Sequence, residues 1–195
     1  MFARHTVPAP DLDQDTIPTV GAVVYPDEEF PEALFDAIVA AHRDRGLALA
    51  GVVQRPVVED PAPGQECDVL LENLVTGDRT VIFEDRGAMA QGCRLDVGAL
   101  IQAATKVEAT LGEDTALVVL NKFGKIEVDG GGMCDLVASA LERGIPVLIG
   151  VPLRHLPAWR NFAGEFALEL PDDLETINRW LAKVTASVGR MDAVA

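Results

Sequence analysis

The 195-residue sequence contains no apolar run of the roughly 18 residues that a membrane-spanning helix needs. Its first ten residues, MFARHTVPAP, lack the apolar central segment of a secretory signal. These two absences predict a cytoplasmic protein with no membrane insertion. Cysteine is also scarce, and the spacing of Cys67, Cys93 and Cys134 matches no zinc framework. Three thiols cannot all pair within one chain, so we interpret them as free thiols in a reducing compartment.

Basic residues are few, with 16 lysines and arginines against 31 acidic residues and a formal net charge of -15. A field of that sign opposes binding to nucleic acid and to anionic membranes, so we expect no nucleic-acid partner. Any anion-binding site in this chain has to be local. It must be built from a few selected cations and backbone amides.

The composition is that of a globular protein, with 49% hydrophobic and 24% charged residues, and the length suits one domain. Residues 1–18 hold three prolines and an acidic segment, which predicts a flexible N-terminal arm. Residues 19–195 are predicted to form a single P-loop-like α/β domain.

The order of the predicted elements defines the fold class. Apolar runs predict buried strands at 20–25, 47–54, 116–120, 145–151 and 166–170. Helices are predicted at about 31–45, 96–111, 133–143 and 171–188. This alternation predicts a three-layer α/β fold, with a mainly parallel sheet and helices on both faces. Two extended runs, 67–74 and 79–84, predict an antiparallel hairpin at one sheet edge. Residues 154–163 are predicted to form a loop with a short helical turn.

The first strand-to-helix turn, Tyr25 to Pro31, lacks the residues of a phosphate-binding P-loop. Such a loop needs glycines, whose amides converge on phosphate, and a Lys-Ser/Thr pair. This turn has no Gly, Lys, Ser or Thr, and it carries two prolines and three carboxylates. The roughly half positive charge of a helix N-terminus does not offset three acids. We therefore predict no ordinary triphosphate binding here.

The run 116–120 leads into Asn121-Lys122-Phe123-Gly124-Lys125, and ligands of parallel sheets bind at carboxyl strand ends. In P-loop hydrolases this strand ends in an acid that holds Mg²⁺. Asn121 and Lys122 stand there instead, so Mg²⁺ is not expected at this position. A lysine at a strand end binds an oxyanion directly. We predict an anion site that includes Asn121, Lys122, Gly124 and Lys125, and the alternative is a solvated surface turn.

Further candidate ligands come from other segments. Gly130, Gly131 and Gly132 precede a helix, so their amides are candidates for an anion nest, although a flexible turn is the alternative. Gly92 and Arg94 are candidate anion ligands at another helix entrance, where Arg94 alternatively pairs with a nearby aspartate. Cys93 is either a reactive thiol or soft-metal ligand, or a buried structural thiol. Gln54 is a candidate hydrogen-bonding partner.

Five segments, taken together, resemble an uncharacterised bacterial family, domain of unknown function 2478, whose genes are often found beside molybdate-transport genes. They are GVVQ (51–54), QGCRLD (91–96), NKFGK-E (121–127), GIPVLIGV (144–151) and AW-NFAG (158–164), and the resemblance covers about residues 19–182. The family looks like a diverged relative of P-loop nucleoside-triphosphatases whose corresponding strand ends in DEIGKME. Against that motif, Asn121 and Lys122 replace Asp and Glu, while Gly124, Lys125 and Glu127 match.

The resemblance implies a P-loop-like fold and a role in molybdenum or tungsten handling, and it brings no catalytic residues. Our first hypothesis is an anion-binding protein without ordinary NTP hydrolysis, with molybdate, tungstate or a nucleotide as candidate ligands. The second is an enzyme with weak nucleoside-triphosphatase or metal-insertion activity. The third is a scaffold or regulator that works through oligomeric contacts, including contacts between copies of this chain, with residues 1–18 as a docking element.

Overall fold

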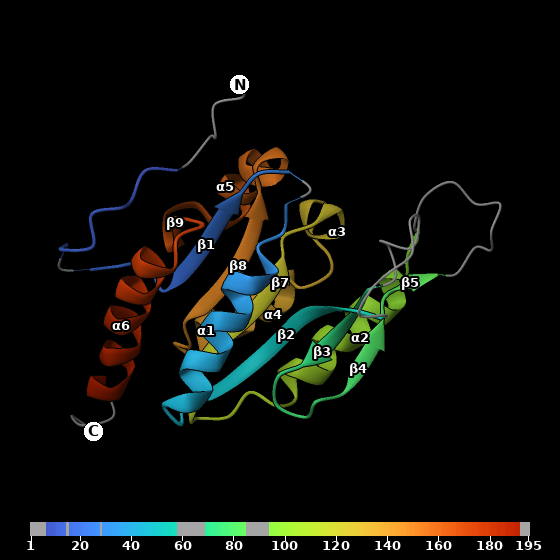
Figure 1. Ribbon diagram of the computed structural model, residues 1–195, viewed down its shortest axis with the longest axis horizontal. Coiled ribbons are helices and arrows are strands. Elements are labelled where there is room, and N and C mark those ends of the chain that lie inside the picture. The colour runs from blue at the N-terminus through green and yellow to red at the C-terminus, as the bar shows by residue number, and fades with distance from the viewer. Residues whose placement is uncertain (1–6, 15, 28, 58–68, 85–93, 192–195) are drawn as a thin grey trace.

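The computed structural model describes residues 7–14, 16–27, 29–57, 69–84 and 94–191, and of Glu84, Arg94 and residues 186–191 it describes the backbone alone. Seven strands form the main sheet (Figure 1): β1 (Val20–Tyr25), β2 (Ala48–Pro56), β3 (Val69–Asn73), β4 (Arg79–Val81), β7 (Thr115–Lys122), β8 (Val147–Pro152) and β9 (Ala167–Pro171). Their order is β4-β3-β2-β7-β8-β1-β9. A separate two-stranded ladder pairs β5 (Phe83–Glu84) with β6 (Arg94–Leu95).

Five neighbouring strands of the main sheet, from β2 to β9, run parallel. Strands β3 and β4 add to the edge beside β2 in antiparallel register. The mainly parallel α/β sheet and its antiparallel edge hairpin are confirmed. Because parallel strands end at the same edge, the carboxyl ends of β7 and β8 lie side by side.

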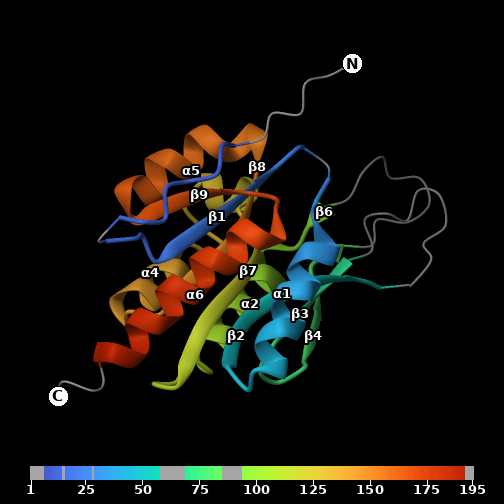
Figure 2. The same cartoon turned by 60° about the vertical axis from the view of Figure 1, so that its left-hand side comes forward.

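Helices cover both faces of the sheet (Figures 1 and 2). The helices are α1 (Glu32–Asp44), α2 (Val97–Glu108), α3 (Lys125–Val128), α4 (Cys134–Glu142), α5 (Leu156–Ala163) and α6 (Leu174–Met191), with 3-10 turns η1 (Leu153–His155) and η2 (Gly164–Phe166). Helices α1 and α6 pack on one face, and α2, α4 and α5 pack on the other. None of the helices in the described ranges is long and apolar enough to cross a membrane.

The central strand β7 shows why the sheet is buried on both faces. Its side chains alternate, so Val118 and Leu120 face the core under α2 and α4, while Leu117 and Val119 face the core under α1 and α6. All four side chains are fully buried. A continuous apolar run is what a strand between two helical layers requires.

The N-terminal segment lies against α6. Leu12 is 5% exposed and belongs to the core under α1 and α6. The Lys183 ammonium donates to the carbonyl of Leu12, and the Trp180 indole N–H donates to the carbonyl of Pro18 at 3.0 Å. The division into a flexible arm (1–18) and one domain (19–195) stays a prediction.

Two local differences from the predicted elements matter for the site. Strand β7 continues through Lys122, so Asn121 and Lys122 belong to the strand and not to the following turn. Residues 156–163 form the regular helix α5 in place of the predicted loop. Its Leu156, Trp159 and Ala163 are buried, and this i, i+3, i+7 spacing forms one apolar helix face.

Candidate functional site

A β-bulge at the end of β7 positions the first two site residues. The pairing with β8 passes from Leu120 opposite Ile149 to Lys122 opposite Gly150, so Asn121 is the extra residue. A Cβ at position 150 would lie 2.6 Å from the carbonyl oxygen of Asn121, which explains the glycine there. Bulges locally turn the strand and re-aim side chains. This bulge places Asn121 and Lys122 at the same cavity.

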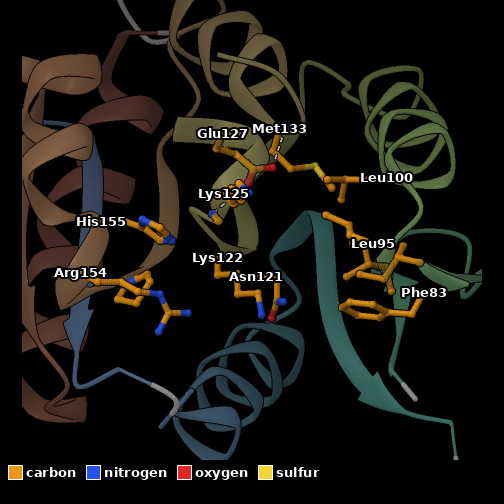
Figure 3. Close-up of a pocket in the computed structure, with 14 residues that line it drawn as sticks. Phe83, Leu95, Leu100, Asn121, Lys122, Lys125, Glu127, Met133, Arg154 and His155 are labelled. Carbon is orange, nitrogen blue, oxygen red and sulfur yellow. Dashed lines mark hydrogen bonds between the residues drawn. The ribbon is translucent and has the colours of Figure 1, made fainter. Parts of the chain in front are cut away.

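The cavity has a volume of about 390 Å³ and opens beyond the carboxyl ends of β7 and β8. Figure 3 shows its lining, with Arg154 and His155 on one side, Lys122 and Asn121 in the middle, and apolar side chains on the opposite side. The lining residues are Leu71, Ile82, Phe83, Leu95, Leu100, Asn121, Lys122, Gly124, Lys125, Glu127, Met133, Pro152, Arg154 and His155.

Lys122 is the central cation of the cavity. Burial lowers the pKa of Lys122, the positive charge of Arg154 lowers it further, and the carboxylate of Glu127 opposes both effects. Both leading causes disfavour the charged ammonium, and an anion placed in the cavity would restore it.

Arg154 and His155 lie in the 3-10 turn η1, which follows β8 directly. Burial lowers the pKa of His155, and the charge of Arg154 lowers it further, while Asp27 raises it. Arg154 is held from the other side, because its backbone N–H donates to the Asp27 carboxylate at 2.9 Å and its guanidinium lies 3.7 Å from the same oxygen. The Asp27 carboxylate, in the first strand-to-helix turn, therefore holds Arg154 in place on the cationic side of the cavity.

Glu127 is 5% exposed and is the carboxylate among the lining residues. One of its oxygens accepts the N–H of Gly124 at 2.9 Å, and the other accepts the N–H of Met133 at 3.1 Å. Burial raises the pKa of Glu127, while these two hydrogen bonds and the charge of Lys122 lower it. The carboxylate thus ties the start of α3 to the start of α4.

The glycine loop closes around that same carboxylate. Gly132 has φ of 61°, and a Cβ there would lie 2.0 Å from the Glu127 Oε1 atom. Any side chain would therefore collide with Glu127, besides straining the left-handed backbone. Gly132 is required because the loop packs against a carboxylate of its own chain.

Asn121 provides a polar atom without a protein partner. Its side-chain amide N–H donates to the side-chain oxygen Oε1 of Gln54 at 2.9 Å, across the β2–β7 pair. Its Oδ1 atom has no hydrogen-bond partner among the described residues, although Asn121 is only 6% exposed. A buried acceptor left unpaired costs free energy, so a donor on a bound molecule would stabilise this site.

The structure brings together four of the predicted site residues, namely Asn121, Lys122, Gly124 and Lys125, which all line the cavity. Gln54 reaches the site through Asn121. Gly130, Gly131 and Gly132 are absent from the cavity lining within the described part of the chain, and the loop they form encloses Glu127. Of Arg94 only the backbone is described, in β6, and Gly92 and Cys93 lie outside the described residues.

Sequence reasoning missed Arg154, His155 and the structural role of Glu127. Arg154 and His155 lie just beyond a predicted buried strand, so the rule that ligands bind at carboxyl strand ends makes them candidates. That rule does not show that their strand lies beside the one that ends at Lys122. Glu127 lies three residues after Gly124, which is the spacing at which a carboxylate reaches back to the N–H that begins a helix. The sequence comparison gives Glu127 only as a match to the DEIGKME motif, without a structural role.

The described residues contain no group of three or more His, Cys, Asp or Glu side chains that could hold a metal ion. Cys134 is buried, and burial, together with the charges of Glu127 and Asp135, raises its pKa to about 11. Its thiol lies 3.4 Å from the Glu127 carbonyl oxygen, to which it donates. Cys134 is therefore a packed, protonated thiol behind the site.

The mainly parallel sheet with helices on both faces is an α/β fold of the P-loop-NTPase-like type. The chain belongs to the family described as protein of unknown function DUF2478, which matches residues 20–180. It is also similar to the molybdenum import ATP-binding protein ModC 2 of Bradyrhizobium diazoefficiens, at 32% identity over 175 residues. That match covers 88% of this chain and 19% of the relative, so the chain spans about a fifth of the relative's length. No solved structure matches the chain with significance.

Proposed function

We propose that this protein binds a small anionic ligand in the cavity at the ends of β7 and β8, in connection with molybdenum handling. The observation that carries the proposal is the gathering of three cationic side chains, Lys122, Lys125 and Arg154, around one cavity that His155 also lines, in a chain with a net charge of -15. A local excess of cations against a strongly acidic background needs a specific cause. Holding an anion is the simplest one.

The charges at the cavity favour the binding of an anion. Glu127 contributes a negative charge, but each of its oxygens accepts a backbone N–H. Lys125 is exposed, and Lys122 is half-buried, so both ammonium groups are available to an anion entering from solvent. Charge-assisted hydrogen bonds of this kind are about twice as strong as neutral ones.

The proposal does not include ordinary NTP hydrolysis. Asn121 and Lys122 occupy the strand end at which the hydrolases hold Mg²⁺ with an acid. The turn after β1 holds Pro26 and Asp27, and that carboxylate is engaged with Arg154. Neither place offers the Lys-Ser/Thr pair that binds phosphate and Mg²⁺.

The link to molybdenum rests on relatives. The similar protein from Bradyrhizobium is named as a molybdenum import ATP-binding protein, and molybdate is a tetrahedral dianion that two lysines and a histidine suit chemically. Molybdate and tungstate are therefore the first ligands to test. A cytoplasmic setting belongs to the same proposal and rests on the reading of the three cysteines as free thiols.

The test compares Lys122→Met with Lys106→Met. Lys106 is an exposed lysine of α2 outside the cavity lining, so both variants remove one positive charge but only one of them alters the cavity. Lys122→Met should fold, because burial already disfavours its charge. We expect molybdate affinity, measured by isothermal titration calorimetry, to fall about ten- to hundredfold in Lys122→Met, the loss of one hydrogen bond to a charged group.

Lys106→Met should bind molybdate within about twofold of the wild type, since it lies outside the cavity. Equal molybdate, tungstate and phosphate binding by the two variants would refute the site assignment. Native mass spectrometry of protein from cells grown with molybdate then identifies the ligand carried in vivo.

A further inference from the structure

The cavity is larger than an inorganic oxyanion requires. At about 390 Å³ it matches the lower range of pockets for organic ligands, which runs from about 300 to 1,000 Å³. It would hold about thirteen water molecules at roughly 30 Å³ each, whereas a five-atom oxyanion takes the room of about two or three. A tetrahedral anion at Lys122 would leave most of the cavity empty.

The part of the cavity far from the cations is apolar. Leu71, Ile82 and Leu100 come from β3, the β4–β5 connection and α2, and each is less than 9% exposed. Phe83 and Leu95 face each other across the β5–β6 ladder and are only half-buried. In Figure 3 the side chains of Phe83, Leu95 and Leu100 lie opposite Arg154 and His155, with Asn121 and Lys122 between.

We propose that the ligand is an organic anion, a planar or apolar body of about a dozen non-hydrogen atoms that carries one phosphate-like or carboxylate group. This inference rests on the proposed function, because the anionic group is the one that Lys122 binds. The body lies against Phe83 and Leu95. A hydroxyl or amino group of the ligand, between its anionic group and its apolar body, donates to the Oδ1 atom of Asn121. That atom is buried and has no hydrogen-bond partner among the described residues.

Two observations favour this ligand over an inorganic ion. Water in the far half of the cavity would have few polar partners among the described residues, whose side chains there are Leu, Ile and Phe. Phe83 and Leu95 keep apolar surface that a ligand body would remove from water, which favours binding in proportion to the area covered. An inorganic oxyanion would use neither wall.

The test measures binding of phenyl phosphate and inorganic phosphate by calorimetry to the full chain. We expect phenyl phosphate to bind about thirtyfold more tightly, the effect of covering one aromatic ring. Phe83→Ala should lower the affinity for phenyl phosphate about tenfold and leave the affinity for inorganic phosphate within about twofold of the wild type. Lys122→Met should lower the affinity for both ligands. Val81→Ala, an exposed change on β4 outside the cavity lining, should weaken neither.

The outcomes separate the two proposals. Equal affinity for the two phosphates, both sensitive to Lys122→Met, would overturn the organic ligand and leave the anion site standing. Binding of neither phosphates nor molybdate would overturn both proposals. If Phe83→Ala does not fold by urea titration, Leu95→Ala reports on the same wall, and an unchanged ratio of the two phosphate affinities in that variant contradicts the inference.

Discussion

Replacement of Glu127 by glutamine tests whether a buried carboxylate organises the site. The carboxylate accepts two backbone N–H groups, from Gly124 and Met133, at 2.9 and 3.1 Å. A glutamine side chain has one carbonyl oxygen and one NH₂ group, so one of those N–H groups would face a donor. Leaving a buried donor unpaired costs about 1–3 kcal/mol. The substitution also removes a buried negative charge and its desolvation penalty, which offsets part of that cost.

We therefore expect Glu127→Gln to lower the free energy of unfolding by about 1–2 kcal/mol at pH 8, or roughly 3–6 °C in Tm for a chain of this size. The control is Glu113→Gln, which removes the same charge from an exposed loop position and should stay within about 0.5 kcal/mol of the wild type. Urea titrations of all three proteins measure these values.

The pH dependence of this penalty has a defined sign. Burial raises the pKa of Glu127 above its ordinary value of 4.5, so the folded state holds the proton more tightly than the unfolded chain does. That contribution to stability is fully present below pH 4.5 and is lost as the pH rises through the folded pKa. The penalty of Glu127→Gln should therefore grow as the pH falls from 8 towards 4.5. A variant as stable as the wild type at pH 8 would refute the role given to this carboxylate.

Three further predictions concern the same region. Gly132→Ala should destabilise the fold by at least about 2 kcal/mol more than Gly130→Ala. Both glycines have positive φ, but only a side chain at position 132 would collide with Glu127, so equal urea midpoints of the two variants would contradict this. Asp96→Ala should lower the free energy of unfolding by about 1 kcal/mol, because it removes the acceptor of the 2.9 Å hydrogen bond from the Ala99 N–H, whereas Asp96→Asn should lower it little. Equal losses of stability in thermal unfolding of the two variants would exclude this helix cap. Sulfate, which keeps its charge from pH 5 to pH 8, should bind more tightly at pH 5 than at pH 8 in calorimetry. A bound anion favours the protonated form of His155, whose pKa lies below its ordinary value of 6.5. A sulfate affinity that does not change with pH would contradict that contact.

Local sequence patterns predicted the architecture well because they specify burial. The run through Leu117 to Leu120 is apolar at every position, and only a strand between two helical layers uses both of its faces in that way. Asp96 precedes an amphipathic segment, and its carboxylate does accept the N–H of Ala99. Helix α5 was predicted only as a loop with a short helical turn, although Leu156, Trp159 and Ala163 carry the helical period. Its eight residues show that period over only about two turns.

The site was only half predictable, for a topological reason. Asn121, Lys122 and Lys125 lie within five residues of one another, so the chain itself places them together. Arg154 and His155 come some thirty residues later, and they join the site only because β7 and β8 are neighbours in the sheet. The apolar wall depends on still more distant pairings, such as Phe83 with Leu95 across β5 and β6. Periodicity along the chain carries no information about such pairings.

The bulge in β7 makes the site depend on a residue that contributes no side chain to it. The carbonyl of Asn121 occupies the space beside Gly150 that a methyl group would fill, and the Tyr25 and Phe30 rings close that space from the other side. The Asn121 backbone and the buried Tyr25 ring cannot retreat easily. A single added carbon at position 150 would therefore press on the segment that carries Asn121 and Lys122 while leaving every charge in place. Loss of binding through shape alone, with the electrostatics intact, is a vulnerability that this fold contains.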